Sequence, residues 1–118
     1  MNEEFIKKIY ASIVEENVAL YKKMYSDLVN GDLDNLNDYS RDRYNLYREF
    51  DESQQKTFFN IIQQVITDTI SNVFGVIDGV CGIDDADWKF KMSINGQDTN
   101  NELQDNFLEY VETIESEE

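Results

Sequence analysis

Residues 58–73 constrain the fold more than any other part of this sequence. Their apolar side chains recur at intervals of three and four, the spacing of one face of an α-helix. The residues of this face are Phe58, Ile62, Val65, Ile66, Thr69, Ile70 and Val73. Asp51 and Gln54 resemble a capping box and predict where the helix begins. Because many of these residues are β-branched, the helix must gain its stability from packing, and we expect it to form the centre of the core.

The same spacing predicts helices on both sides of this one. The first covers residues 2–29, with Asn2 as its N-cap and Asn30-Gly31 as its stop signal. A shorter helix covers residues 39–50. The last begins at Thr99, where four residues match the capping-box pattern, and its buried stripe is Leu103, Phe107, Val111 and Ile114. Two rows of apolar residues run along this first helix. One row is Phe5, Ile9, Ile13, Leu20, Met24 and Leu28, and the other is Ile6, Tyr10, Val14, Val18, Tyr21 and Tyr25.

Residues 88–94 carry the one clean strand pattern, in which Trp88, Phe90, Met92 and Ile94 alternate with polar residues. Asn95-Gly96 is typical of a hairpin turn, but residues 97–101 are too polar for a returning strand. The expected partner is therefore residues 76–83, which could instead continue the preceding helix. Without that pairing the strand is an exposed edge, open to a second chain.

Together these patterns predict a mainly α fold with a minor β part. We expect three to four helices and a small two-stranded β element before the C-terminal helix. The length of 118 residues suits a single domain over 1–118, with residues 114–118 frayed.

The charge of the chain restricts its partners. Twenty-five Asp and Glu oppose ten Lys and Arg, which gives a net charge of −15, and there is no His. Nucleic acids and anionic membranes would repel such a chain, whereas a basic protein surface would attract it. With 41% hydrophobic residues the chain can still build a core. No secretion signal or membrane span is recognisable, so we expect a cytoplasmic protein that makes no membrane contact.

Little in the sequence indicates a cofactor or a metal. Cys81 stands alone, without a His to activate it, so we interpret it as a small buried hydrophobic residue. Asp32 and Asp34 begin like a calcium loop, but Leu36 stands where the third ligand should be. The Asp84-Asp85-Ala86-Asp87 cluster lacks the spacing and the glycine of such a loop. We therefore predict neither a metal site nor a cofactor.

A carboxylate active site is a third hypothesis, after a protein that binds a basic partner and a homo-oligomeric structural module. Such a site needs an acid in an apolar pocket. Asp68 and Asp78 are the acids set in apolar runs. We expect Asp68 on the polar side of its helix with Gln64 and Asn72, and Asp78 at a helix end beside Gly79. No companion base is identifiable, so we predict that the protein is not an enzyme.

Four acids of the last helix follow a three-four-three spacing, which places them on one side of that helix: Glu102, Asp105, Glu109 and Glu112. They form either a solvated outer face, or a row that binds Lys and Arg of a partner, or an imitation of a nucleic-acid backbone. The spacing alone does not distinguish these roles.

One segment is locally basic and aromatic. Tyr44, Tyr47 and Arg48 belong to it, together with Tyr39, Phe50, Arg41 and Arg43. Tyr and Arg are enriched at the energetic centres of protein interfaces, so this segment is a second candidate for partner binding. In the alternative interpretation the rings complete the core and the Arg residues answer the surrounding acids.

These observations favour a small acidic, non-enzymatic protein that binds a basic protein partner as an inhibitor, immunity protein or regulator. In this general character the chain is similar to many bacterial and phage immunity proteins, antitoxins and inhibitors. One alternative is a homo-oligomeric module, such as a homodimer, joined through the 88–94 strand or the wide face of the first helix. A further alternative is a nucleic-acid mimic. The acidity could also serve only solubility.

Overall fold

The structure is a computed structural model, and it describes residues 1–29 and 33–117. The helices are α1 (Asn2–Ile9), η1 (Tyr10–Glu15), α2 (Glu16–Val29), α3 (Asp38–Arg48), α4 (Glu52–Ile77) and α5 (Leu103–Ser116), and the strands are β1 (Ser93–Ile94) and β2 (Gln97–Asp98). The mainly α class, with a two-stranded β element before the last helix, is confirmed. The expected stop signal at Asn30-Gly31 lies outside the described residues.

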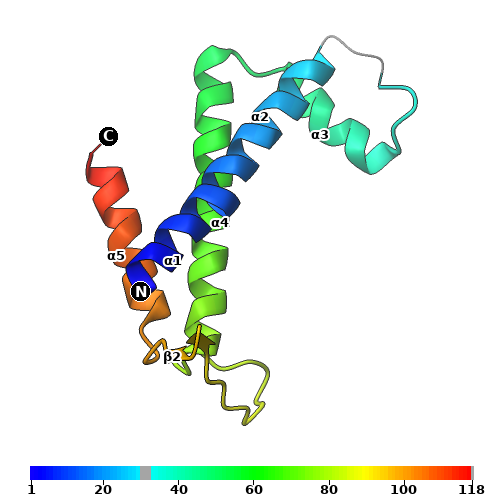
Figure 1. The fold of residues 1–118 in the computed structure, drawn as a ribbon. Coiled ribbons are helices and arrows are strands. Elements are labelled where there is room, and N and C mark those ends of the chain that lie inside the picture. Colours follow the sequence, from blue (N-terminus) through cyan, green and yellow to red (C-terminus); the bar gives the residue numbers. More distant parts are fainter. Residues whose placement is uncertain (30–32, 118) are drawn as a thin grey trace.

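The helices form an elongated body rather than a sphere. α1, η1 and α2 follow one another as a rod that crosses α4, and α4 runs back in the opposite direction (Figure 1). α5 packs beside α1 and α4 at one end, while α3 packs on α2 at the other. The molecule measures 49 × 36 × 22 Å, and its radius of gyration is 17.9 Å. Since a compact chain of this length has a radius of about 13.5 Å, the fold leaves much of its surface open.

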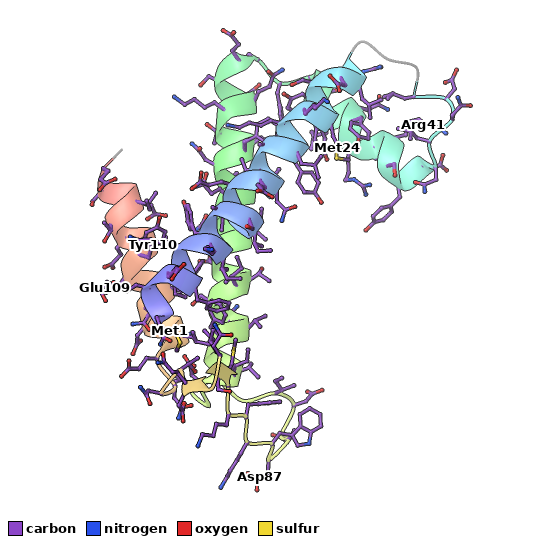
Figure 2. The ribbon with its side chains drawn as sticks, in the orientation of Figure 1. Met1, Met24, Arg41, Asp87, Glu109 and Tyr110 are labelled. Atoms are coloured by element: carbon purple, nitrogen blue, oxygen red, sulfur yellow. The ribbon has the colours of Figure 1, made fainter. Side chains whose placement is uncertain are left out.

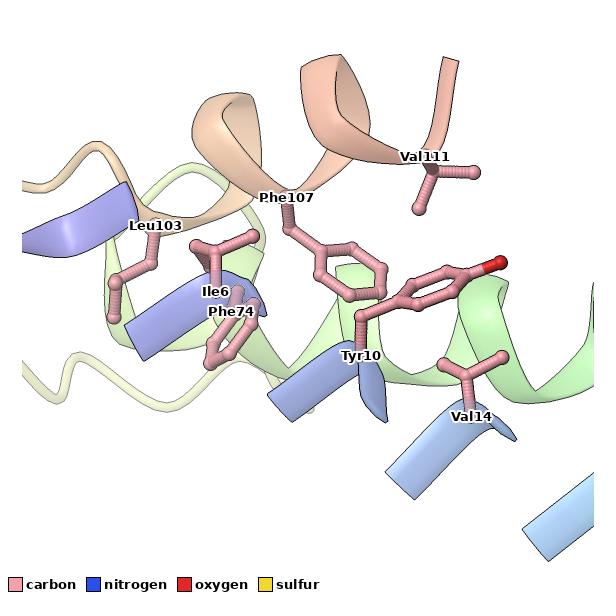
Figure 3. Close-up of a cluster of buried hydrophobic side chains, with 7 residues drawn as sticks. All are labelled: Ile6, Tyr10, Val14, Phe74, Leu103, Phe107 and Val111. Atoms are coloured by element: carbon pink, nitrogen blue, oxygen red, sulfur yellow. The ribbon is translucent and has the colours of Figure 1, made fainter. Parts of the chain in front are cut away.

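The first of two apolar clusters, the lower cluster, joins α1, η1, α4 and α5. Its buried members are Ile6, Tyr10, Val14, Phe74, Leu103, Phe107 and Val111 (Figure 3). The Phe107 ring lies 5.7 Å from Phe74 and 6.5 Å from Tyr10, between centroids. The buried stripe predicted for the last helix is thus confirmed, with Ile114 packed at its margin. Helix α5 continues to Ser116, through part of the segment expected to fray.

The second cluster, the upper cluster, joins α2, α3 and α4 through aromatic rings. Its buried members are Tyr25, Leu33, Tyr44, Tyr47 and Phe59. Tyr25 is the hub, because its ring lies 4.7 Å from Tyr44, 5.1 Å from Tyr47 and 5.4 Å from Phe58. Burial raises the pKa of the Tyr25 phenol above its usual value, and nearby Arg43 offsets part of that shift. The upper cluster therefore holds α3 against the two long helices.

Of the two rows predicted on the first helix, one is buried except at Tyr21, and the other is exposed in three of its six residues. Ile6, Tyr10, Val14, Val18 and Tyr25 are buried, whereas Ile13, Leu20 and Met24 face solvent. Between α1 and α2 the backbone forms a π-helix, η1, over Tyr10–Glu15. The Asn17 side chain donates to the Ile13 carbonyl oxygen at 2.7 Å, next to this widened turn.

The face predicted for the central helix is only half correct. Helix α4 begins with the predicted capping box, in which Asp51 accepts from the Gln54 backbone and Gln54 returns the bond. Its fully buried side, however, passes through Phe59, Thr67, Ser71 and Phe74. Val65 and Val73, expected in the core, are exposed. The helix is apolar over a wider arc than its neighbours cover, so the apolar pattern could not reveal which part is buried.

The strand prediction is wrong in its length and in its partner. Only Ser93 and Ile94 form β1, and they pair antiparallel with Gln97 and Asp98 of β2. Asn95 and Gly96 connect the two strands, and their φ angles of 51° and 83° are those that a two-residue hairpin turn requires. The hairpin turn thus outweighs the polarity of the returning strand. Residues 76–83 contain no strand, since α4 continues to Ile77.

The predicted caps at Asn2 and Thr99 are also wrong. Asn2 is the first residue of α1 and donates to the Thr99 carbonyl oxygen and to Asn106 Oδ1, both at 3.0 Å. Thr99 is buried, and α5 begins at Leu103 after Asn100 and Asn101, both of which adopt positive φ. The cap that the sequence pattern placed at Thr99 is supplied by a distant residue.

Asp78, at the end of α4, provides that cap. Its Oδ2 accepts a 2.7 Å hydrogen bond from the Gln104 backbone N–H in the first turn of α5. The Gln104 side chain in turn donates to the Ser71 carbonyl oxygen at 3.0 Å. Gly75 permits this approach, since a Cβ there would lie 2.7 Å from Gln104 Nε2. Asp78 and Gln104 therefore fix α5 against the last turns of α4.

Replacing Asp78 with alanine is expected to lower the free energy of unfolding by about 1–2 kcal/mol, because a first-turn N–H of α5 loses its acceptor. Asp78→Asn should lose less, since an amide oxygen can still accept that bond. Urea denaturation of each variant measures the difference. Asp68→Ala, at an exposed acid of the same helix, is the control and should stay within about 0.5 kcal/mol of wild type. Equal stability of Asp78→Ala and wild type would contradict the capping role.

Candidate functional site

The four acids singled out by spacing form an exposed row along α5, called here the acidic row. Asp105, Glu109 and Glu112 lie in the helix, and Glu102 is the residue that precedes it. All four are exposed. At about 100° per residue they point away from the buried Leu103–Phe107–Val111 stripe. Figure 2 shows Glu109 directed away from the helical body. Ten residues at 1.5 Å each give the row a length of about 15 Å.

The carboxylates of α5 have no cation partner in residues 1–29 and 33–117. The ion pairs found there are Lys8–Glu4, Arg41–Asp38 and Lys91–Asp98. Helix α5 itself contains Asp105, Glu109, Glu112 and Glu115 but neither Lys nor Arg. Their charges therefore add to one negative potential over the outer face of the helix.

This arrangement does not help the helix to fold. Glu112 and Glu115 lie towards the C-terminal end of α5, where the backbone dipole is negative and cations are preferred. Acids three and four residues apart also repel one another, as Asp105 and Glu109 do. Each effect costs a few tenths of a kcal/mol, so helix stability does not account for the row.

A groove of about 300 Å³ between α4 and α5 adds a further acid that spacing did not connect with the row. It is lined by Asp68 and Gln64 of α4 and by Leu108, Glu112 and Glu115 of α5, among others. Asp68 is exposed, as predicted for the polar side of its helix. Because Asp68 and Glu112 come together only through the contacts between α4 and α5, no pattern in the sequence could place them side by side.

On its other side the acidic row meets the start of α1. Glu3 and Lys7 share a groove with Glu109, and Glu3 also lines a polar hollow with Glu102 and Asp98. The pKa of Asp98 is lowered, chiefly because the Asn100 backbone N–H donates to its Oδ1 at 2.8 Å, and Lys91 adds to the effect. These carboxylates extend the negative surface from α5 towards the hairpin and the N-terminus.

The second candidate segment is placed differently. Tyr44 and Tyr47 are 8% and 4% exposed and belong to the upper cluster. Their rings are therefore packed against Tyr25 and Phe59 instead of facing solvent. Arg48 donates to the Leu28 carbonyl oxygen at 3.4 Å. In this structure the three residues join α3 to its neighbours, and the acidic row and this segment lie on different helices at opposite ends of the molecule (Figure 1).

The other cations of that segment also have local partners. Arg41 donates to the Leu36 carbonyl oxygen at 2.8 Å and lies 3.5 Å from an Asp38 oxygen. Arg43 lies over the exposed Tyr39 ring, 5.5 Å from its centroid. In the connector before α3, Leu33 is buried and Leu36 is partly buried.

The position predicted for Cys81 is wrong, whereas the position predicted for Asp78 is confirmed. Cys81 is exposed, so its interpretation as a buried hydrophobic residue is wrong. It follows the end of α4, where the chain turns away from the lower cluster. Asp78 ends α4, as predicted, and is the one buried acid in the described part of the chain.

No group of three or more Cys, Asp or Glu suited to holding a metal ion occurs among the described residues.

Comparison of the chain with known protein families, curated proteins and solved structures found no match. Across residues 1–29 and 33–117, no helix has the length and apolar character needed to cross a bilayer.

Proposed function

We propose that the protein is a non-enzymatic binding protein whose acidic row docks on a basic surface of a partner protein, as an inhibitor, immunity protein or regulator. The observation that carries this proposal is the unpaired charge of α5, which has four acids, no base and no ion pair with the rest of the described chain. A surface that costs helix stability and forms no ion pair within the described chain is suited to binding external cations.

The structure suits such docking in two further respects. The row lies on a helix anchored by Phe107 and Leu103, so its carboxylates are held on a rigid support. Asp68 and Glu115 widen it into a groove that long Lys or Arg side chains could enter. Asp78, the one buried acid among the described residues, already caps α5, so we assign it no catalytic role.

We also propose that the encounter takes place in the cytoplasm. Cys81 is an exposed thiol with no second Cys in the chain, and such thiols persist most readily in a reducing compartment.

The test compares two variants of equal net charge. One neutralises the row through Asp105→Asn, Glu109→Gln and Glu112→Gln. The control neutralises three exposed acids near α3, through Asp42→Asn, Glu49→Gln and Glu52→Gln. Proteins retained from a native extract by immobilised wild type at low salt should be lost by the first variant and kept by the second.

With a retained protein in hand, titration should show a dissociation constant raised about 10-fold or more by the row variant, mainly through slower association. Affinity of the wild type should also fall steeply with added salt. Equal binding by the two variants, or binding that ignores salt, would remove the acidic row from the function.

A further inference from the structure

A second surface stands apart from the acidic row and carries almost no charge. From Thr57 to Ile77, α4 has a single charged residue, Asp68, in a chain that is 30% charged. Yet Ile61, Val65 and Val73 are 55%, 57% and 53% exposed. An apolar row this long, open to water along a central helix, is unusual for a monomer with a surface otherwise rich in acids.

Packing places this row on the side of α4 away from α5. The Gln63 side chain donates a hydrogen bond to the Tyr10 hydroxyl of η1, and the Gln104 side chain of α5 donates one to the Ser71 hydroxyl. Gln63 and Ser71 therefore mark the sides of α4 that its neighbours cover. At about 100° per residue, Val65 points more than 100° away from both directions. Asp68 is turned into the groove beside α5. Val65, Thr69 and Val73 therefore face away from the acidic row, and Asp68 lies about 100° around the helix from the middle of these three residues. Ile61, seven residues before Asp68, lies on the side of that carboxylate.

Neighbouring segments extend the row into a broad face. Tyr21 and Met24 are further exposed apolar residues on α2, which belongs to the rod that crosses α4 (Figure 1). Figure 2 shows Met24 on the side of the molecule away from Glu109. Towards the end of α4, Val76 lines a hollow with Trp88 and Phe90, and both of these rings are exposed. We call this surface the uncharged face.

The amount of exposed surface indicates what covers it. The chain exposes 8573 Å², whereas a compact monomer of 13.9 kDa exposes about 6,700 Å². The excess, roughly 1,900 Å² over the whole elongated chain, is about twice the area that one partner buries in an interface of standard size, so the chain has enough surface for a stable dimer.

We propose that the uncharged face is the interface of a homodimer, in which α4 of one copy packs antiparallel on α4 of the other. A two-fold axis near Thr69 would set Val65 of each copy against Val73 of its partner, so the row is complementary to itself. Thr69 is small enough to let the helices approach at that point. Asp68, turned towards α5, would stay at the margin.

Charge favours a second copy over a basic partner at this surface. The row of Val65, Thr69 and Val73 offers no carboxylate to attract cations, and along it two chains of −15 can meet without facing charges. Dimerisation should therefore strengthen as salt screens the repulsion between copies. Docking on the acidic row should weaken under the same change, so the two interactions are distinguishable.

Sedimentation of the whole chain at micromolar concentration tests the proposal. Wild type should sediment with twice the mass of the 13.9 kDa chain, and more completely at high salt. The double variant Val65→Glu, Val73→Glu should raise the dimer dissociation constant by about 100-fold or more, because two central contacts are replaced by repelling charges. Leu108→Glu, an exposed apolar residue of α5, is the matched control and should remain dimeric.

The double variant also separates lost dimerisation from lost folding. Both valines are more than half exposed in the single chain, and Glu has the higher helix propensity, so a folded helical monomer is expected by circular dichroism. A wild type that stays monomeric at high micromolar concentration would overturn the proposal. A dimer that persists in Val65→Glu, Val73→Glu would do the same by placing the interface elsewhere.

Discussion

Replacing Phe107 with alanine is expected to lower the free energy of unfolding by about 3–5 kcal/mol, the largest effect of any substitution considered for this protein. The Phe107 side chain is 0% exposed, and its ring lies beside Phe74 of α4 and Tyr10 of η1 in the lower cluster. Its removal leaves a cavity between α5, α4 and η1 that these helices cannot close without moving apart. Urea or thermal unfolding followed by circular dichroism measures the loss.

Leu108→Ala is the matched control for this variant. Leu108 is the next residue of α5, but it is exposed at the rim of the groove. Its loss should cost less than about 1 kcal/mol. If both substitutions cost the same, the lower cluster does not hold α5 in place, and the support assumed for the acidic row is lost as well.

Tyr25→Ala should have the second largest effect, about 3 kcal/mol, since its ring joins α2 to both α3 and α4. The short helix α3 has fewer contacts than the long helices, so we expect it to loosen before the rest of the molecule. Hydrogen exchange should show lost protection at the α3 amides and retained protection in α5. Tyr25→Phe keeps the ring and should stay within about 1 kcal/mol of wild type.

Uniform loss of protection along the whole chain in Tyr25→Ala would contradict this picture. It would mean that the upper and lower clusters unfold as one unit. The acidic row would then depend on the aromatic cluster as much as on Phe107.

The sequence predicted elements well where apolar and polar residues contrast sharply. Helix α5 has a narrow stripe of buried residues against a row of acids, and both faces were identified correctly from spacing alone. Helix α4 is apolar on more than one side, so its pattern showed a helix but not its buried side. Val65 and Val73 were assigned to the core and are exposed, because coverage depends on neighbours that the pattern does not contain.

Local signals misled where distant residues replaced the expected partners. Thr99 has the pattern of a cap, yet Asp78 caps α5 from the end of α4. The alternation at residues 88–94 is typical of a strand, but the Asn95-Gly96 turn set a pairing of only two residues on each side. In the candidate site, the acids of α5 were recognised by spacing, while Asp68 joined them only through helix packing.

The sequence by itself determined the helical composition, the strong negative charge and the position of the acidic row, because these follow from residue type and spacing within one segment. Only the tertiary structure decided that Tyr44 and Tyr47 are buried and that Asp68 lies beside α5. It also decided that one apolar side of α4 is left uncovered. These properties arise from contacts between segments far apart in the chain, and the free energy of such contacts depends on which surfaces meet.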